Sequence, residues 1–147
     1  MDERLKKIAE YLDNEGIENY VPEELQEKLS ETTSVLSVPY GFDNCHFRIN
    51  LFTSTEGKNI KFTTSDFARY PQDKIGKAFE VINSINREHP LLKFCVDPED
   101  GGVNAEYDLT VDLELDKIGN AAFEIILLFF LIIKDDAFPA IMKSIWS

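Results

Sequence analysis

Apolar residues in the first part of the chain follow two different periods. Between residues 5 and 12 they recur at the spacing of one helix face, as Leu5, Ile8, Ala9 and Leu12. From Thr33 the period changes to two, which predicts half-buried strands at 35–38, 45–51 and 60–64. Turn-rich links at 39–44 and 55–58 join them into an antiparallel meander. Residues 17–32 fit neither period, apart from a short helix that Pro22 would begin.

The middle of the chain returns to the helical period and then to strands. Apolar positions predict an amphipathic helix over 71–87 that ends at His89-Pro90. A short strand follows at 92–96, and the acidic, glycine-containing segment 97–102 predicts a turn. Over 103–114 apolar and polar residues then alternate without interruption, which is the clearest strand pattern in the chain.

The C-terminal part is predicted to be helical, with Asp116 as its N-terminal cap. Residues 121–133 are apolar on nearly every side, and Ile125–Ile133 contains no polar residue. As a helix this run is about 14 Å long, against about 30 Å of bilayer hydrocarbon, so it indicates a buried helix and not a membrane span. Residues 134–136 are expected to break the helix before a final apolar segment. A helix that is apolar all round must be covered by the sheet together with other helices or a second subunit.

These elements predict an α+β fold with the order α-βββ-α-ββ-α and an antiparallel sheet of about five strands. The 147 residues fit one domain, 1–147, and 44% hydrophobic content is ordinary for a globular protein. The first residues contain no apolar segment typical of a signal peptide, so we expect a cytoplasmic protein. Free thiols are then the default for Cys45 and Cys95.

The charge of the chain excludes some partners. Fifteen Lys and Arg stand against 27 Asp and Glu, a net charge of −12, and the bases form no cluster. Nucleic acids and anionic membrane surfaces are therefore not expected as partners. One face of the 103–114 strand gathers acidic residues at Glu106, Asp108, Asp112 and Glu114. This is either a solvated sheet face or a surface for a basic partner.

Candidate chemistry is sparse in the sequence. His46 and His89 are the only imidazoles, and neither lies in a recognisable catalytic motif. The two Cys and two His lack the paired spacing of a zinc site. The acidic loop 97–102 departs from a calcium loop through Pro98 and Gly101 and favours a hairpin turn. Gly101-Gly102 leads into a strand and not into a phosphate-binding helix. We expect no catalytic residue, no metal site and no cofactor.

Bulky apolar residues near the C-terminus offer a candidate interaction surface. Most of them are expected in the core, but a share would line a dimer seam or a groove for a partner peptide. The candidates are Phe129, Phe130, Leu131, Phe138 and Trp146.

The segment 78–112 resembles a known family. It contains an apolar helix with the pairs Ile82-Asn83 and Ile85-Asn86, then a strand, an acidic turn with glycine and a long alternating strand. Together with the ending DDAFPAIMKSIWS it resembles the YbjN family, described as putative bacterial sensory transduction regulators. The order of elements is that of this family's fold, which is similar to type III secretion chaperones. Those chaperones are small acidic dimers that hold an extended partner segment, so the resemblance implies binding, and it supplies no catalytic residue.

Three hypotheses of function follow from the sequence. The leading one is a non-enzymatic cytoplasmic protein-binding module, chaperone-like or a regulatory adaptor, that acts as a homodimer. The alternative is a small-molecule or signal-sensing regulator with a pocket between the sheet and the C-terminal helix. The third is an enzyme, which would require a closed polar cleft with converging titratable groups.

Overall fold

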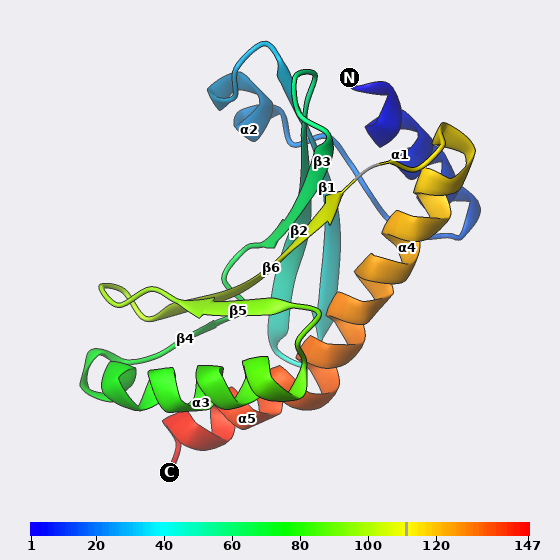
Figure 1. Ribbon diagram of the computed structural model, residues 1–147. Coiled ribbons are helices and arrows are strands. Elements are labelled where there is room, and N and C mark those ends of the chain that lie inside the picture. The colour runs from blue at the N-terminus through cyan, green and yellow to red at the C-terminus, as the bar shows by residue number, and fades with distance from the viewer. Residues whose placement is uncertain (111) are drawn as a thin grey trace.

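A strongly bent antiparallel sheet organises the chain in the computed structural model, which describes residues 1–110 and 112–147 (Figure 1). The strands are β1 (Thr33–Phe42), β2 (Cys45–Ser54), β3 (Asn59–Thr64), β4 (Ala68–Arg69), β5 (Lys93–Val96) and β6 (Gly102–Thr110). β1, β2 and β3 form the expected meander, and β3 pairs with β6. Val103 of β6 pairs with Ala68 of β4 on one side and with Val96 of β5 on the other. The α+β class with an antiparallel sheet is therefore confirmed, with β4 as a short strand that the sequence did not predict.

Helices cover the apolar face of this sheet. They are α1 (Glu3–Asn14), α3 (Ile75–Glu88), α4 (Leu115–Ile132) and α5 (Phe138–Ile145). The short helix α2 (Glu23–Lys28) buries no residue and lies on the other side of the sheet from α1 and α4 (Figure 1). α4 packs along α1, and α3 packs beside α5 at the other end of the sheet (Figure 1). The predicted apolar stripe of α1 is buried at Leu5, Ile8 and Leu12. Gly119 lets α4 approach α1 closely, because a Cβ there would lie 2.6 Å from Cβ of Tyr11. Among the described residues, no helix has the length and apolar character that crossing a membrane requires.

The predicted turn at 39–44 is wrong in extent. β1 continues to Phe42, and the turn is confined to Asp43 and the residue after it, with φ +48° at Asp43. Proline is tolerated here because β1 is an edge strand, where the missing N–H of Pro39 leaves no neighbour unpaired. Tyr40 faces inward and stacks on Phe130 of α4 at a ring separation of 3.8 Å. Tertiary packing therefore extends the strand through residues that are typical of turns.

The strand predicted over 103–114 is shorter in the structure. β6 ends at Thr110, Val111 lies outside the described residues, and residues 112–114 are exposed and belong to no strand. The prediction that Asp116 caps the following helix is also wrong. α4 begins at Leu115, with Glu114 at the cap position, and the Glu114 side chain makes no capping hydrogen bond. Asp116 lies in the first helical turn, where a negative charge is favourable.

The expected break at 134–136 is absent, because the helix continues through a π-helical turn, η2 (Ile133–Ala137), into α5. Pro139 explains the wider turn, since a proline ring clashes with the carbonyl four residues earlier in a regular helix. Ile133 and Ala137 stay buried while Lys134, Asp135 and Asp136 face solvent. The charges therefore occupy the outer side of a continuous, bent helix.

The start of α1 is held by a carboxylate whose titration can be tested. Asp2 accepts hydrogen bonds from the Arg4 backbone N–H (2.8 Å) and from its guanidinium (2.9 Å). Burial raises the pKa of the Asp2 carboxyl, but the hydrogen bonds and charge of Arg4 outweigh it, so the pKa lies below its ordinary value. A carboxyl with a lowered folded-state pKa stabilises the fold above its unfolded-state pKa, and this stabilisation is lost as the pH falls.

We therefore expect Asp2→Asn to lower the free energy of unfolding by about 1–2 kcal/mol at pH 7. The difference from wild type should shrink below about pH 4, where the unfolded-state carboxyl is protonated, and should disappear once the folded-state carboxyl is protonated as well. Urea unfolding at several pH values measures it. Glu3→Gln is the control, because it removes the same charge from an exposed neighbouring position. A pH-independent difference would show that the charge of Asp2 contributes nothing.

Candidate functional site

The aromatic and apolar residues predicted as an interaction surface do not form one surface. Phe129 is 0% exposed and Phe130 7%, so both belong to the core of the chain. Phe138 is half-buried, with its ring 5.4 Å from that of Phe42. Leu131 is 59% exposed beside β1, whereas Trp146 is 82% exposed at the other end of the helical segment, near Pro71. The apolar helix is thus largely covered by the chain itself, and the exposed part is smaller than the sequence suggested.

The predicted acidic surface is also divided. Glu106 and Asp108 lie on β6, on the sheet face opposite the core. Glu106 lies 3.9 Å from Lys61 and 3.5 Å from Lys93, so two ammonium groups offset its charge. Asp112 and Glu114 are exposed in the link to α4 and do not share the strand face. The four carboxylates are therefore not one continuous stripe.

The residues with candidate chemistry are scattered. His46 is exposed on β2, while Nε2 of His89 lies 3.0 Å from Oδ2 of Asp136 near the end of α3. Cys45 is buried and donates to the carbonyl of Phe67, and burial raises the pKa of its thiol. Cys95 lies on β5, whereas Cys45 lies on β2, and both thiols are free. In the part of the chain that the structure describes, no group of three or more His, Cys, Asp or Glu is placed to hold a metal ion.

The acidic loop after β5 is a turn, as predicted. Oδ1 of Asp97 accepts from the backbone N–H of Glu99, and Oδ1 of Asp100 accepts from that of Gly102, both at 2.8 Å. Gly101 has φ +78°, a left-handed conformation that glycine adopts readily. These carboxylates are thus used by the backbone of their own loop.

An apolar groove lies between α4 and β1, and we refer to it as the α4–β1 groove. It has a volume of about 600 Å³. Its lining residues are Gly16, Ile17, Glu18, Pro39, Tyr40, Leu127, Phe130 and Leu131. Leu127 and Leu131, one helical turn apart, are 36% and 59% exposed and form its outer wall. The groove therefore presents apolar side chains to solvent directly beside the edge of the sheet.

The outer edge of β1 is only partly paired. Tyr20 exchanges two backbone hydrogen bonds with Ser37 (2.8 and 2.9 Å), and the Gln26 side chain binds the backbone of Thr33 and Val35. Outward-facing residues alternate along an edge strand, so the next ones are Pro39 and Gly41. Among the described residues, no backbone hydrogen bond joins Pro39 or Gly41 to the 16–20 segment. This short edge borders the α4–β1 groove.

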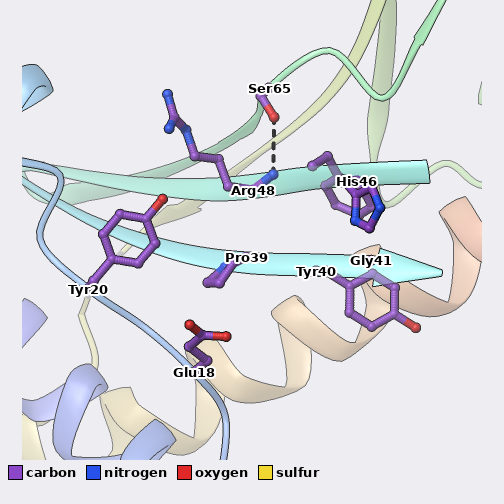
Figure 2. Close-up of a pocket in the computed structure, with 9 residues that line it drawn as sticks. Glu18, Tyr20, Pro39, Tyr40, Gly41, His46, Arg48 and Ser65 are labelled. Atoms are coloured by element: carbon purple, nitrogen blue, oxygen red, sulfur yellow. Dashed lines mark hydrogen bonds between the residues drawn. The ribbon is translucent and has the colours of Figure 1, made fainter. Parts of the chain in front are cut away.

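A second hollow, which we call the donor pocket, lies across β1 from the groove and has a volume of about 480 Å³ (Figure 2). Its polar lining comes from Glu18, Tyr20, His46, Arg48 and Ser65, with Pro39 between the two sides. Ser65 fixes the backbone of Arg48, because its Oγ accepts from Arg48 N–H (3.0 Å) and its N–H donates to the Arg48 carbonyl (2.9 Å). The two hollows share Glu18, Pro39 and Tyr40, so the 16–20 segment forms a wall of both.

The local sequence explains these positions. His46 and Arg48 alternate with the core residues of β2 and therefore point to the opposite face. Gly41 leaves room for the imidazole of His46, since a Cβ there would lie 2.5 Å from its Nδ1. Chemically, the arrangement offers hydrogen-bond donors and apolar surface, and it contains no described pairing of a nucleophile with a base.

The sequence does not predict the donor pocket, and of the α4–β1 groove it predicts only the general place, between the sheet and the C-terminal helix. Their walls come from residues 16–20, 39–48 and 127–131, which the fold brings together from distant parts of the chain. The one available signal was the ambiguous segment 17–32, which had polar and apolar residues but no period of its own.

Comparison with known proteins supplies the family. No significant match to the chain is found among curated proteins, and none is found among solved structures. The likeness to secretion chaperones therefore stays a prediction. The model of the YbjN family, described as "Putative bacterial sensory transduction regulator", matches residues 4–142, which is nearly the whole chain. The resemblance carried by segment 78–112 is confirmed, and the chain belongs to the YbjN family.

Proposed function

We propose that the chain is a non-enzymatic cytoplasmic regulator that binds an extended segment of a partner protein in the α4–β1 groove. The observation that carries the proposal is the exposed apolar wall of Leu127 and Leu131 beside the partly unpaired edge of β1. A regulatory role agrees with the description of the family.

The form of the partner segment follows from the sheet edge. Gly41 offers an outward N–H and C=O, and Pro39 offers an outward C=O, so an extended segment can add to β1 through backbone hydrogen bonds. Side chains of an added strand alternate between two faces, so every second one would face Leu127 and Leu131. A partner segment with alternating apolar residues therefore fits both features.

The negative charges around the groove favour basic residues on either side of the apolar positions of that segment. Glu18 lines the groove, and the exposed Glu124 lies one helical turn before Leu127. The chain as a whole carries a net charge of −12. Basic residues on either side of the apolar positions would therefore accelerate association and oppose binding to the wrong partners.

A second copy of the chain is the competing occupant, and it would make the predicted homodimer. Each copy carries a net charge of −12, so two copies repel one another overall, although the exposed Lys134 beside Leu131 would offset part of the charge of Glu124 across a two-fold axis. A basic partner segment is electrostatically the better occupant. We therefore propose the partner segment for the groove and treat the homodimer as an outcome to be tested.

The test is selection from a random peptide library displayed on phage, with the wild-type chain as bait. We expect enriched peptides to alternate apolar residues and to carry Lys or Arg at their flanks, and Leu131→Glu to weaken their binding at least tenfold by placing a charge in the groove. Leu91→Glu is the matched control, because Leu91 is 64% exposed on the loop after α3 and should leave binding unchanged.

Two results would contradict this proposal. One is enrichment of no common pattern, or of peptides that bind the Leu131→Glu chain equally well. The other is a dimer in light scattering at micromolar concentration that Leu131→Glu dissociates, which would assign the groove to a second copy.

A small apolar ligand is the second candidate for the same groove, because about 600 Å³ lies within the range of small-molecule sites. The groove also lies between sheet and C-terminal helix, where the sensing hypothesis placed a pocket. A ligand that raises the melting temperature of the wild type but not of Leu131→Glu would support a regulator that senses a small molecule over one that binds a partner segment.

A further inference from the structure

Arg48 is the residue of the donor pocket with a buried polar group that has no partner within the described part of the chain. Its Nε is buried and has no hydrogen-bond partner. None of the ion pairs in the described part of the chain includes it, although the chain carries 27 carboxylate side chains. A buried donor without an acceptor destabilises the folded state, so a half-buried guanidinium left unpaired on so acidic a protein points to an absent acceptor.

The groups around Arg48 define the chemistry of that acceptor. Figure 2 shows the side chain of Arg48 extending from β2 toward the end of the pocket where Tyr20 lies, with His46 at the other end. Ser65 adds a hydroxyl whose oxygen already accepts from Arg48 N–H, so its proton is free to donate into the pocket. Guanidinium, phenol, hydroxyl and imidazole N–H groups all donate, and an oxyanion accepts from all of them.

Carboxylates near Arg48 would compete with an oxyanion ligand for its guanidinium. Glu18 is the only carboxylate among the described residues that line the pocket, and it lies on the opposite wall, beyond β1 (Figure 2). A neighbouring hollow on the other side of Arg48 contains Glu23 and Glu24, but also Lys28. Since none of these carboxylates pairs with Arg48, its guanidinium stays available.

We propose that the donor pocket binds a small oxyanion ligand, through a carboxylate or a phosphate group that pairs with the guanidinium of Arg48. Tyr20 and Ser65 donate to the same group, and His46 contacts the remainder of the ligand. The volume of about 480 Å³ accommodates a metabolite-sized molecule. Arg48 does not line the α4–β1 groove, although the two hollows share Glu18, Pro39 and Tyr40, so the proposal does not require a partner segment in the groove.

The test is a titration followed by two-dimensional ¹H–¹⁵N NMR, in which the Nε–H of Arg48 gives its own signal. Inorganic phosphate and acetate are the two probes, and sodium chloride at the same ionic strength is the reference. We expect either probe to shift the Arg48 Nε–H signal and the backbone amides of Gly41 and Ser65 along saturable curves. Saturation by one probe only would identify phosphate or carboxylate as the source of the ligand's oxyanion.

Variants distinguish binding of the oxyanion at Arg48 from a nonspecific effect of ionic strength. Arg48→Gln should weaken binding about tenfold or more, and Arg48→Lys should also weaken it, because lysine keeps the charge but loses the planar fork. Glu18→Gln should strengthen binding a fewfold by removing the one carboxylate of the pocket. Lys6→Gln, which removes an exposed positive charge from α1, should change nothing.

Three results would overturn the proposal. They are shifts that do not saturate, shifts that sodium chloride reproduces, and saturation that persists unchanged in Arg48→Gln. The Nε–H signal is read from the wild-type chain, so the proposal can be rejected even if the Arg48 variants fail to fold.

Discussion

Replacing Phe129 with alanine should destabilise the chain by about 3–5 kcal/mol, the range for aromatic truncation in a packed core. Phe129 is 0% exposed, and its ring stacks on that of Phe62 with centroids 6.3 Å apart and planes 16° from parallel. α4 is held against the sheet at this point, so the cavity left by the ring cannot be filled without moving a helix. Urea unfolding followed by circular dichroism measures the loss.

Leu131→Ala is the matched control for Phe129→Ala. Leu131 lies two positions later on the same helix but is 59% exposed, so its truncation should change the free energy of unfolding by at most about 0.5 kcal/mol. It should instead weaken binding in the α4–β1 groove. Equal destabilisation by the two substitutions would contradict the assignment of Phe129 to the core and of Leu131 to the surface.

Gly101→Ala should destabilise the chain by about 3 kcal/mol, from left-handed backbone strain and a steric collision together. Gly101 has φ +78°, and a Cβ there would collide with the carbonyl oxygen of Tyr70 and lie 3.1 Å from its carbonyl carbon. Tyr70 cannot move aside easily. Its N–H donates to the Gly101 carbonyl (2.8 Å), its side chain is 1% exposed, and its hydroxyl bonds to Ser144 (2.7 Å).

Gly16→Ala separates the two contributions. Gly16 has φ +73°, close to that of Gly101, but a Cβ there would meet nothing within 4 Å. It should therefore cost only the conformational strain, about 1–2 kcal/mol. Thermal and urea unfolding of both variants give the difference. If Gly16→Ala costs as much as Gly101→Ala, the contact with Tyr70 has no energetic role.

The sequence predicted elements well where one period dominates. α1, α3, β2 and β3 all show a clean apolar spacing, and the structure contains each of them. The errors occur where tertiary contacts override local preference. Residues 39–42 look like a turn, yet the stacking of Tyr40 on Phe130 holds them in a strand. Residues 134–136 look like a helix break, yet burial of Ile133 and Ala137 on either side keeps the helix continuous.

The donor pocket, and the residues that line the α4–β1 groove, could not be predicted for a different reason. Arg48 is an ordinary polar residue in an alternating strand, and only the fold shows that its Nε is buried without a partner. Leu127 and Leu131 belong to a uniformly apolar run, in which sequence cannot distinguish the two exposed residues from Phe129 and Phe130. Phe129 is among the candidate surface residues for that reason, and in the structure it lies in the core.

The wall that both hollows share has a thermodynamic consequence. The 16–20 segment is joined to the edge of β1 through the two backbone hydrogen bonds between Tyr20 and Ser37. If an oxyanion at Arg48 favours one position of this wall, and a peptide beside Leu131 favours the same or another position, the two equilibria are linked. Linkage is reciprocal, so the factor by which the oxyanion changes peptide affinity must equal the factor by which the peptide changes oxyanion affinity. Through this linkage the chain would convert the concentration of a metabolite into the occupancy of its partner site.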